Sequence, residues 1–236
     1  MGAERVAVVT GANRGIGLEI CRQLAASGLN VVLTSRDAAK GKAACKTLTS
    51  AGLQVIYRRL DVTSVRAIRA LAEFMQNEFG RIDVLVNNAG VMLDPRGTRF
   101  LDSALATYRA TFEVNVWGAL ALTQAVLPLM QKRGYGRIVN LSSGLGQFTG
   151  MGNSTPAYRM SKTALNALTC IVAAETQGNN ILVNAACPGW VRTDMGGARA
   201  PLAVNESVAA MLAVIDGLKS GDSGRFLDYT GADVAW

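Results

Sequence analysis

Short apolar runs rich in β-branched residues alternate along the chain with longer stretches of helical periodicity. Continuously apolar runs predict buried strands, and apolar residues three and four apart predict helices, as at Leu18–Ser27, Val65–Phe79 and Ala157–Thr176. The expected strands are Arg5–Thr10, Val31–Ser35, Gln54–Arg59, Val84–Asn87, Arg137–Leu141, Ile181–Ala186 and, on the weakest pattern, Arg225–Leu227. Buried strands separated by helices indicate a parallel sheet that is covered on both faces.

The same pattern bears on domain organisation. The chain has 236 residues, with no Pro-, Gly- or Ser-rich linker and no internal repeat. We therefore expect an α/β fold in which residues 1–236 form a single doubly wound domain around a seven-stranded parallel sheet. Ala104–Lys132 is expected to form one long helix, which Pro128 kinks or ends in its last turn. Gly144–Thr155 is expected to be a loop.

Composition indicates a folded protein. Half of the residues are hydrophobic and 17% are charged, which argues against disorder. Polar residues interrupt the apolar runs, so no segment is expected to span a bilayer. The first apolar run, Val6–Val9, has no signal-peptide pattern ahead of it, and a cytoplasmic location is the expectation.

The residue types narrow the chemistry. The chain contains no histidine, which excludes Ser-His-Asp and Cys-His nucleophile mechanisms and imidazole metal sites. Its four cysteines form no Cys-x-x-Cys pair, so neither a metal site nor a redox dithiol is expected. General acid–base chemistry must therefore come from Tyr, Lys, Asp or Glu.

The net charge of +7 leaves two classes of partner open, nucleic acid and phosphorylated small molecules. The basic residues are spread along the chain and aromatic residues are few, so a basic cleft for a phosphorylated small molecule explains the charge at least as well. We expect a small-molecule partner, with no nucleic acid and no membrane.

A glycine-rich turn follows the first expected strand, with the sequence Thr10-Gly11-Ala12-Asn13-Arg14-Gly15-Ile16-Gly17. Glycines at such a turn let the backbone approach a pyrophosphate, while the N-terminus of the next helix faces the anion. The spacing Gly-x-x-x-Gly-x-Gly differs from the commoner Gly-x-Gly-x-x-Gly, and a plain tight turn is the alternative. The position after a buried strand favours a dinucleotide site. Its residues would be Gly11, Asn13, Arg14, Gly15, Ile16 and Gly17.

The end of the second expected strand bears on the choice of cofactor. Asp37 lies about 20 residues after the glycines, where NAD sites place an acid on the ribose, but it better suits the start of the next helix. Ser35 and Arg36 occupy the strand end, where a guanidinium can bind the 2′-phosphate of NADP(H). Arg14 supplies a second cation, although both arginines could be solvated surface residues. We predict NADP(H) in preference to NAD(H).

Polar residues and glycines follow four other expected strands, as Asp61-Val62, Asn87-Asn88-Ala89-Gly90, Ser142-Ser143 and Pro188-Gly189. In an open parallel sheet the carboxyl ends of the strands line one crevice, which is where ligands bind. Each segment alone could be an ordinary turn. Their convergence on one edge favours a ligand site.

Tyr158 and Lys162 lie four residues apart on an expected helix and therefore share a face. A free tyrosine has a pKa near ~10, and a nearby ammonium favours the phenolate and lowers that pKa. The pair is a candidate acid–base device, although Tyr and Lys at this spacing are also common on helix surfaces.

Together these residues resemble the short-chain dehydrogenase/reductase family. The matching motifs follow the family's order over nearly the whole chain: Thr10–Gly17, Asn87–Gly90, Asn115, Ser143, Tyr158-x-x-x-Lys162, Pro188-Gly189 and Thr193. The stretches Val32–Asp37 and Cys187–Met195 are similar to the carbonyl reductase branch in particular. The resemblance implies a Rossmann fold and an oxidoreductase that moves a hydride between NADP(H) and a carbonyl or alcohol carbon.

The resemblance also implies a role for each residue. Tyr158 would give its proton to the carbonyl oxygen, and Lys162 would lower the Tyr158 pKa and bind the nicotinamide ribose. Ser143, rather than Ser142, would donate a hydrogen bond to the carbonyl oxygen. Asn115 would hold a water that relays protons to Lys162. Cofactor contacts would also come from Asp61 and Val62 at the adenine, from Asn88, Ala89 and Gly90, and from Pro188, Gly189, Val191 and Thr193.

One departure from the family bears on assembly. The monomeric carbonyl reductases carry a long insertion ahead of the tyrosine, whereas here only Gly144–Ala157 separates Ser143 from Tyr158. The helix faces around Asn115 and Lys162 are therefore expected to be uncovered, and in the family such faces pair. We expect a homo-oligomer, a dimer or tetramer, which size-exclusion chromatography would detect.

Apolar loop residues are candidates for a substrate pocket, namely Leu93, Leu145, Phe148, Met151, Trp190 and Met195. Each could equally pack in the core or at a subunit contact. If they line a pocket, the substrate is an apolar ketone, aldehyde or quinone rather than a sugar or an acid. The alternative function is a catalytically silent NADP(H)-binding regulatory or interaction protein, against which the intact Ser143, Tyr158 and Lys162 argue.

Overall fold

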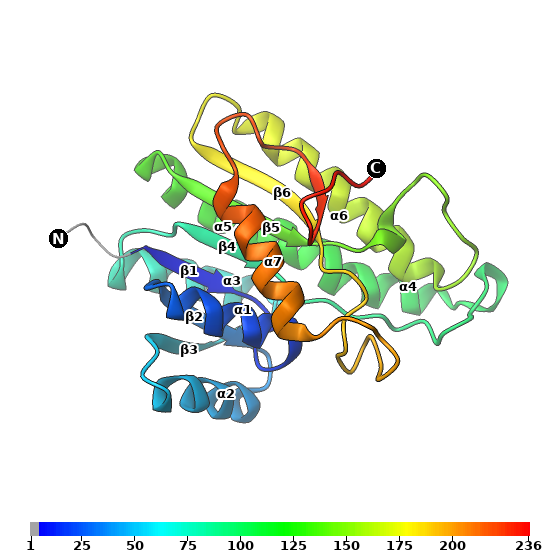
Figure 1. Cartoon of the computed structure of the whole chain (residues 1–236), viewed down its shortest axis with the longest axis horizontal. Coiled ribbons are helices and arrows are strands. Elements are labelled where there is room, and N and C mark those ends of the chain that lie inside the picture. Colours follow the sequence, from blue (N-terminus) through cyan, green and yellow to red (C-terminus); the bar gives the residue numbers. More distant parts are fainter. Residues whose placement is uncertain (1–4) are drawn as a thin grey trace.

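The computed structural model describes residues 5–236 (Figure 1). Within them the strands are β1 Val6–Val9, β2 Asn30–Ser35, β3 Val55–Arg59, β4 Val84–Asn87, β5 Gly136–Leu141, β6 Ile181–Cys187 and β7 Phe226–Asp228. The helices are α1 Gly15–Ala26, α2 Ala38–Ser50, α3 Val65–Glu78, α4 Leu105–Phe112, α5 Gly118–Arg133, α6 Pro156–Glu175 and α7 Val204–Gly217. Short 3₁₀ turns lie at Phe100–Asp102 and Gly144–Gly146.

The seven strands form one sheet in the order β3-β2-β1-β4-β5-β6-β7, and every pairing is parallel. The seven expected strands and the doubly wound fold are confirmed. After β3 the chain crosses back past β1 and adds β4 on the other side, so the connections from β1 and β4 leave in opposite directions. Ligands bind at such a switch point in open parallel sheets.

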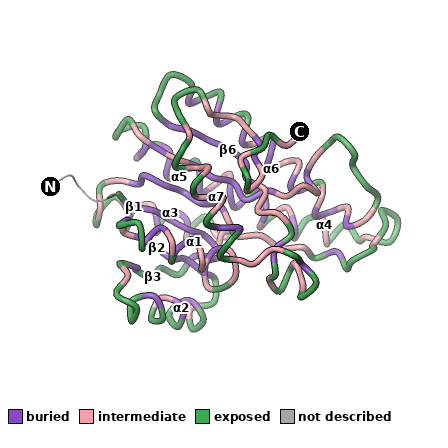
Figure 2. The backbone as a smooth tube through the Cα atoms, in the orientation of Figure 1, coloured by how far each residue is buried: buried purple, intermediate pink, exposed green. Residues whose placement is uncertain are grey.

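Helices cover both faces of the sheet (Figure 1). On one face, residues of α1 and α7 such as Ile20 and Met211 are buried against the strands. On the other face, α3 and α5 bury residues such as Met75 and Leu122. Figure 2 shows buried strands between helices whose outer sides are exposed. Burial on both faces explains why the central strands are continuously apolar rather than alternating.

The expected single helix Ala104–Lys132 is interrupted in the structure. A π-helical turn, Glu113–Trp117, separates α4 from α5. Helix α5 continues past Pro128 to Arg133, and Gly134 follows it in the left-handed conformation with φ 66°. The glycine therefore ends the helix, and Pro128 does not.

Leu105–Arg133, taken as one helical stretch, is long and apolar enough to cross a membrane by length and composition. Length and composition alone therefore do not exclude a membrane span here, although polar residues such as Thr111 and Asn115 interrupt the stretch. The structure buries both of these polar side chains. It also buries Leu122, Val126 and Met130 against the sheet, as expected for the core helix of a folded domain.

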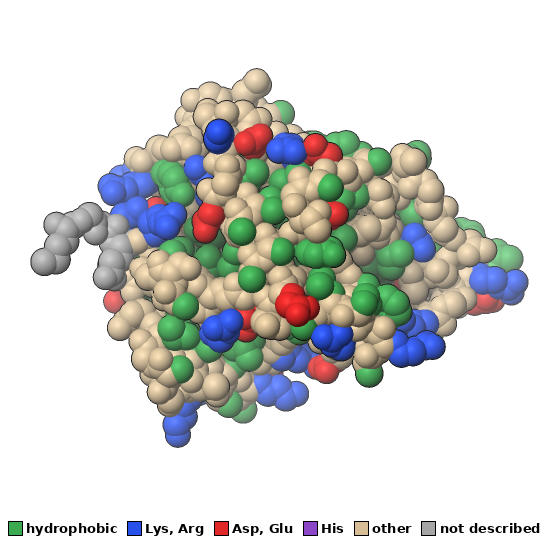
Figure 3. All heavy atoms as spheres, viewed as in Figure 1, with side chains coloured by type: hydrophobic (Ala, Val, Ile, Leu, Met, Phe, Trp, Pro, Cys, Tyr) green, Lys and Arg blue, Asp and Glu red, His purple; other side chains and the backbone are tan. Residues whose placement is uncertain are grey.

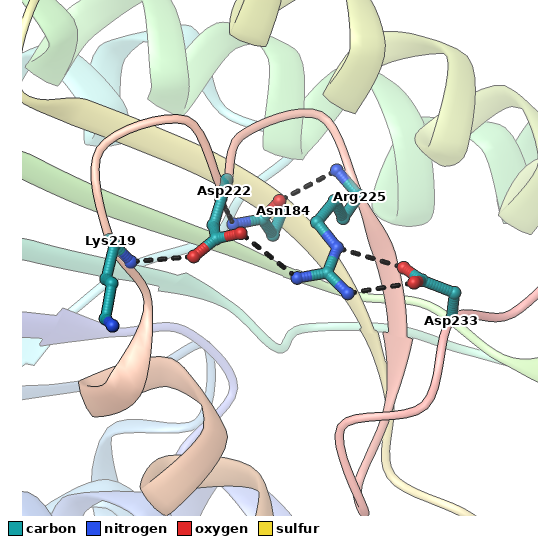
Figure 4. A network of polar contacts seen from close by, with 5 residues as sticks. All are labelled: Asn184, Lys219, Asp222, Arg225 and Asp233. Carbon is teal, nitrogen blue, oxygen red and sulfur yellow. Dashed lines mark hydrogen bonds and ion pairs between the residues drawn. The ribbon is translucent and has the colours of Figure 1, made fainter.

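The edge strand β7 is held by polar side chains as much as by apolar ones (Figure 4). Asn184 of β6 accepts a hydrogen bond from the Arg225 backbone N–H at 2.8 Å and donates to the Asp222 carbonyl at 2.7 Å. The Arg225 guanidinium binds Asp222 at 3.2 Å and both oxygens of Asp233 at 2.9 Å. This network explains why the apolar pattern predicts β7 only weakly.

Candidate functional site

A groove of about 1160 Å³ runs along the carboxyl ends of the central strands. It is lined by segments that follow β1 to β6, so the fold brings together residues that are far apart in the sequence. Most of the residues predicted to form a site line this groove: Gly11, Asn13, Arg14, Gly15, Ile16, Gly17, Arg36, Asp61, Val62, Asn88, Ala89, Gly90, Ser143, Leu145, Tyr158, Lys162, Pro188, Gly189, Trp190, Val191, Thr193 and Met195.

Several predicted residues lie outside the lining of the groove. Ser35 is buried, and its hydroxyl donates to the Asp37 carbonyl at 2.8 Å instead of facing the groove. Phe148 and Met151 are 77% and 40% exposed and do not join Leu145. After its 3₁₀ turn this loop is joined to Trp236, since the Thr149 backbone N–H donates to the Trp236 carbonyl at 3.2 Å. Leu93, also exposed, lies outside as well.

The glycine turn is packed closely against the segment after β4. The Asn88 amide donates to the carbonyls of Thr10 and Gly11 at 2.7 and 3.2 Å. A Cβ on Gly11 would lie 2.9 Å from the Ala89 Cα, and a Cβ on Gly17 would clash with the Asn88 amide. Any side chain at these positions would therefore push the two segments apart.

The turn also leaves room for a ligand. Gly15 has a φ of +55°, and a Cβ there would lie 3.5 Å from the Thr193 methyl group on the opposite wall. The space between the turn and the loop after β6 is thus kept open by the missing side chain. The cradle and the N-terminus of α1 behind it fit the pyrophosphate of a dinucleotide.

The end of the groove next to β2 and β3 carries both signs of charge. Asp37 is confirmed as the N-cap of α2, since its carboxylate accepts from the Lys40 backbone N–H at 3.0 Å. Burial raises the pKa of Asp61, but hydrogen bonds from Thr63 and the charges of Arg36 and Arg59 outweigh it and hold that pKa below its usual value. Arg36 lines the groove here and is positioned to meet an anion.

Arg14 spans the groove. Its guanidinium binds the carboxylate of Asp194, in the loop after β6, so an ion pair joins the two walls. Both side chains are largely exposed, 71% and 75%. Asp194 therefore competes with any bound phosphate for one of the two arginines that were predicted to recognise NADP(H).

Tyr158, Ser143 and Lys162 meet at the centre of the groove. Burial raises the pKa of Tyr158 to about 12, and a hydrogen bond with the Ser143 side chain opposes that rise. Ser142, by contrast, donates to Asn166 at 2.6 Å and is committed to the core. The Lys162 ammonium lies 5.6 Å from the centroid of the Tyr158 ring and donates to the Leu141 carbonyl at 2.6 Å.

The net direction of the Tyr158 pKa differs from the expectation. We expected the ammonium to lower the Tyr158 pKa, but desolvation of the phenolate dominates and the net direction is upward. The same burial lowers the pKa of Lys162 to about 8. The site therefore holds a protonated phenol at neutral pH beside an ammonium that loses its proton more easily than an exposed lysine.

Asn115 lies behind the groove, on the π-helical turn. Its side chain accepts from the Val91 backbone N–H at 2.8 Å and donates to the Val91 carbonyl and the Ser161 hydroxyl, both at 2.9 Å. A Cβ on Gly90 would lie 3.5 Å from both the Asn115 Oδ1 and the Lys162 Nζ, so the bare glycine separates them. π-Turns recur at functional sites.

Asp94 positions the start of α6 and was not predicted. Thr155, the N-cap of α6, has an unfavourable φ of 49° and makes no side-chain capping bond. The buried Asp94 carboxylate takes over, accepting from the Tyr158 backbone N–H at 3.0 Å and from the Ser103 hydroxyl at 2.8 Å. A carboxylate on the loop after β4 thus fixes the first turn of the helix that carries Tyr158.

Replacing Asp94 with Ala is expected to lower the free energy of unfolding by about 2 kcal/mol, because it leaves the buried Tyr158 N–H without an acceptor. Asp94→Asn is the matched control, since its amide oxygen can accept from Tyr158 while its NH₂ donates to Ser103. We expect a loss below about 1 kcal/mol for it. Urea unfolding measures both changes, and equal losses in the two variants would contradict the capping role.

The groove also contains charged residues that sequence analysis missed, namely Lys40, Arg96, Arg159, Arg192 and Asp194. Arg159 directly follows Tyr158, and Arg192 and Asp194 flank Thr193. For these three residues, proximity in the sequence to a predicted site residue is the one signal that could have identified them. No sequence signal identifies Arg96, because the pattern of hydrophobic and polar residues does not place the loop after β4 beside the loop after β6. The structure joins these loops through hydrogen bonds from Arg96 to the carbonyls of Met195 and Gly196.

The fold and motifs match known proteins. A model of the short chain dehydrogenase family matches residues 5–201. An NADPH carbonyl reductase of Sus scrofa is 34% identical over 94% of this chain and 91% of its own. A (+)-neomenthol dehydrogenase of Arabidopsis thaliana is 34% identical over 87% of this chain and 89% of its own. The crystal structure of an NADPH-bound carbonyl reductase from chicken fatty liver has a TM-score of 0.90 and 32% identity, with 99% of both chains covered.

Proposed function

Because this chain belongs to the short-chain dehydrogenase family, we propose that it is an NADPH-dependent oxidoreductase that reduces a carbonyl group to an alcohol, and the reverse. The meeting of Tyr158, Ser143 and Lys162 beside the glycine-turn groove is the observation that best supports this proposal. NADPH-linked carbonyl reductases among the relatives support the choice of cofactor.

Tyr158 is proposed as the proton donor to the carbonyl oxygen. With a pKa of about 12 the phenol is protonated at neutral pH, so the proton that carbonyl reduction requires is present. The Ser143 hydroxyl, already within hydrogen-bonding reach of the phenol, is proposed to donate to the same carbonyl oxygen as negative charge develops there. Bound NADPH would supply the hydride.

Lys162 is proposed to steady the phenolate that remains after proton transfer and to bind the nicotinamide ribose. The ammonium donates one hydrogen bond to the Leu141 carbonyl, which leaves further N–H groups for these tasks. Asn115 is proposed to hold the water that returns a proton toward Lys162. Its NH₂ group donates to Val91 and Ser161 and its oxygen accepts from Val91, which fixes the side chain and leaves one lone pair of the oxygen for a water.

The cofactor is proposed to lie along the whole groove. The glycine turn would hold the pyrophosphate, Asp61 and Val62 the adenine, and Arg36 with Arg14 the 2′-phosphate. Contacts near the nicotinamide would come from Asn88, Ala89 and Gly90 on one wall and from Pro188, Gly189, Val191 and Thr193 on the other. The single domain 1–236 would then carry both the cofactor and the substrate site.

The substrate is proposed to be a carbonyl compound with an apolar body. Leu145, Trp190 and Met195 line the groove and supply apolar surface near Tyr158. This wall is thinner than the sequence predicts, since Phe148 and Met151 do not contribute to it.

A comparison of NADPH and NADH in ketone reduction tests the proposal, and Arg36→Ala sharpens the test. Loss of a charge-assisted contact to the 2′-phosphate is expected to raise the KM for NADPH by about tenfold to a hundredfold while leaving the KM for NADH nearly unchanged. Arg58→Ala, which removes a cation stacked on Phe74 outside the groove, is the control. An equal change with both cofactors would contradict the role of Arg36. Tight NADPH binding with no turnover of any carbonyl or alcohol would favour the silent binding protein.

A homo-oligomer and a cytoplasmic location stay predictions. The exposed apolar side chains Trp117, Met160 and Ile171 on the α5 and α6 side support pairing of copies. Figure 3 shows basic side chains scattered among acidic ones on the face viewed, which gives no support to a nucleic-acid surface there.

A further inference from the structure

We propose that Arg96 and Arg159 form a receptor for an anionic group of the substrate, so that the preferred carbonyl compound carries a carboxylate or a phosphate. This inference rests on the proposed function. It also changes the predicted substrate class, because the sequence analysis predicts an apolar carbonyl compound rather than an acid. Both arginines line the same groove as Tyr158.

The two arginines come from different segments of the chain that the fold brings together. Arg159 follows Tyr158 in α6, and its Nε donates to the Ser154 carbonyl at 2.7 Å. The next residue, Thr155, donates its backbone N–H to the Thr98 carbonyl at 2.9 Å, which joins this segment to the loop that carries Arg96. Arg96 and Arg159 therefore lie two and four residues along the chain from this hydrogen bond, and both line the same groove.

Neither guanidinium is paired with a carboxylate among residues 5–236. One terminal nitrogen of Arg96 donates to the Met195 and Gly196 carbonyls, at 3.0 and 2.8 Å. These contacts orient both groups while neutralising neither. A planar guanidinium with N–H groups to spare matches the fork of a carboxylate or phosphate.

The acids that line the groove are occupied elsewhere. Asp194 pairs with Arg14, Asp37 caps α2 beside Lys40, and Asp61 accepts from Thr63. Asp94 does not line the groove. Its two carboxylate oxygens accept hydrogen bonds from the Ser103 hydroxyl and the Tyr158 backbone N–H. The substrate side is left with uncompensated positive charge.

One edge of the Arg159 guanidinium packs against Gly152, which does not line the groove and whose Cβ would lie 3.0 Å from a terminal nitrogen of Arg159. Since Leu145, Trp190 and Met195 line the same groove, the substrate that fits has an apolar body, a carbonyl group and one anionic end.

Two matched pairs of ketones test the inference with NADPH as reductant: benzoylpropionate against its methyl ester, and dihydroxyacetone phosphate against dihydroxyacetone. We expect kcat/KM for a charged ketone to exceed that of its neutral partner by about tenfold, and the ratio to fall as salt is raised. The first pair identifies a carboxylate and the second a phosphate.

Arg159→Gln is expected to remove most of the preference for the charged ketone, and Arg159→Lys to restore part of it. Arg96→Gln, at a more exposed site, should reduce it by about threefold.

Arg199→Gln is the matched control. Arg199 is an exposed arginine of the loop after β6 and does not line the groove. The ratio should stay at its wild-type value in this variant. Turnover of neutral ketones without any charge preference, or an unchanged ratio in Arg159→Gln, would overturn the inference and leave the proposed function intact. If no ketone is reduced, titration calorimetry of benzoylpropionate and dihydroxyacetone phosphate with the enzyme–NADPH complex decides. Tighter binding to wild type than to Arg159→Gln would support the receptor, and equal or undetectable binding would overturn it.

Discussion

Replacing Tyr158 with Phe is expected to reduce the kcat of carbonyl reduction by about a hundredfold to ten-thousandfold, the contribution of a well-placed general acid. The phenylalanine ring fills the same buried space, so the change removes the acidic O–H and its interaction with Ser143 and little else. The fall in dihydronicotinamide absorbance as NADPH is consumed measures turnover. Quenching of protein fluorescence by NADPH measures binding, which should change little.

The direction of the Tyr158 pKa adds a pH signature. With the phenol pKa raised to about 12, the acid form persists across the neutral range, and reduction should vary little with pH below about 8. Alcohol oxidation needs the phenolate and should rise steadily as the pH becomes alkaline. A Tyr158→Phe variant that retained near-normal turnover, or lost NADPH binding along with it, would refute the assignment of Tyr158 as the acid.

Replacing Lys162 with Met is expected to abolish most activity and to change the pH dependence of stability. Burial lowers the Lys162 pKa from 10.5 to about 8, so the folded protein holds this proton less tightly than the unfolded chain. Below about pH 8 both states are protonated and the folded state bears the full cost of a buried charge. Between pH 8 and 10.5 the unfolded chain binds more protons, and the stability of the wild type should rise.

The methionine variant lacks this titration. The wild type should therefore gain on the order of 3 kcal/mol relative to Lys162→Met between about pH 8 and pH 10.5. Comparing the two proteins cancels the buried thiol of Cys21, whose raised pKa lowers stability in alkali in both. Chemical denaturation at several pH values measures the difference. Parallel stability curves for the two proteins would show that Lys162 is not desolvated as described.

The sequence predicts the fold well because buried parallel strands are apolar along their whole length. Each strand end falls within one residue of its expected position. The π-helical turn around Asn115 was missed, since one inserted helical residue leaves the apolar spacing almost unchanged. Strand β7 was weakly predicted, because the Asn184–Arg225 network that holds it depends on residues that lie close only after folding.

The catalytic part of the site could be predicted where spacing carries the signal, as for Tyr158 and Lys162 on one helix face. Asp94 could not, because its two hydrogen bonds join segments with no regular spacing. The direction of the Tyr158 pKa also escaped sequence reasoning. Proximity of Lys162 can be inferred from the sequence, but the desolvation that raises the Tyr158 pKa depends on what covers the phenol.

The ion pair between Arg14 and Asp194 has a consequence for traffic through the groove. Two largely exposed side chains attract each other only weakly in water, by less than about 1 kcal/mol. The ion pair therefore breaks and re-forms by thermal motion, and a dinucleotide can enter the groove without a larger rearrangement. Once a phosphate has entered, Arg14 can exchange its carboxylate partner for the ligand at almost no energetic loss.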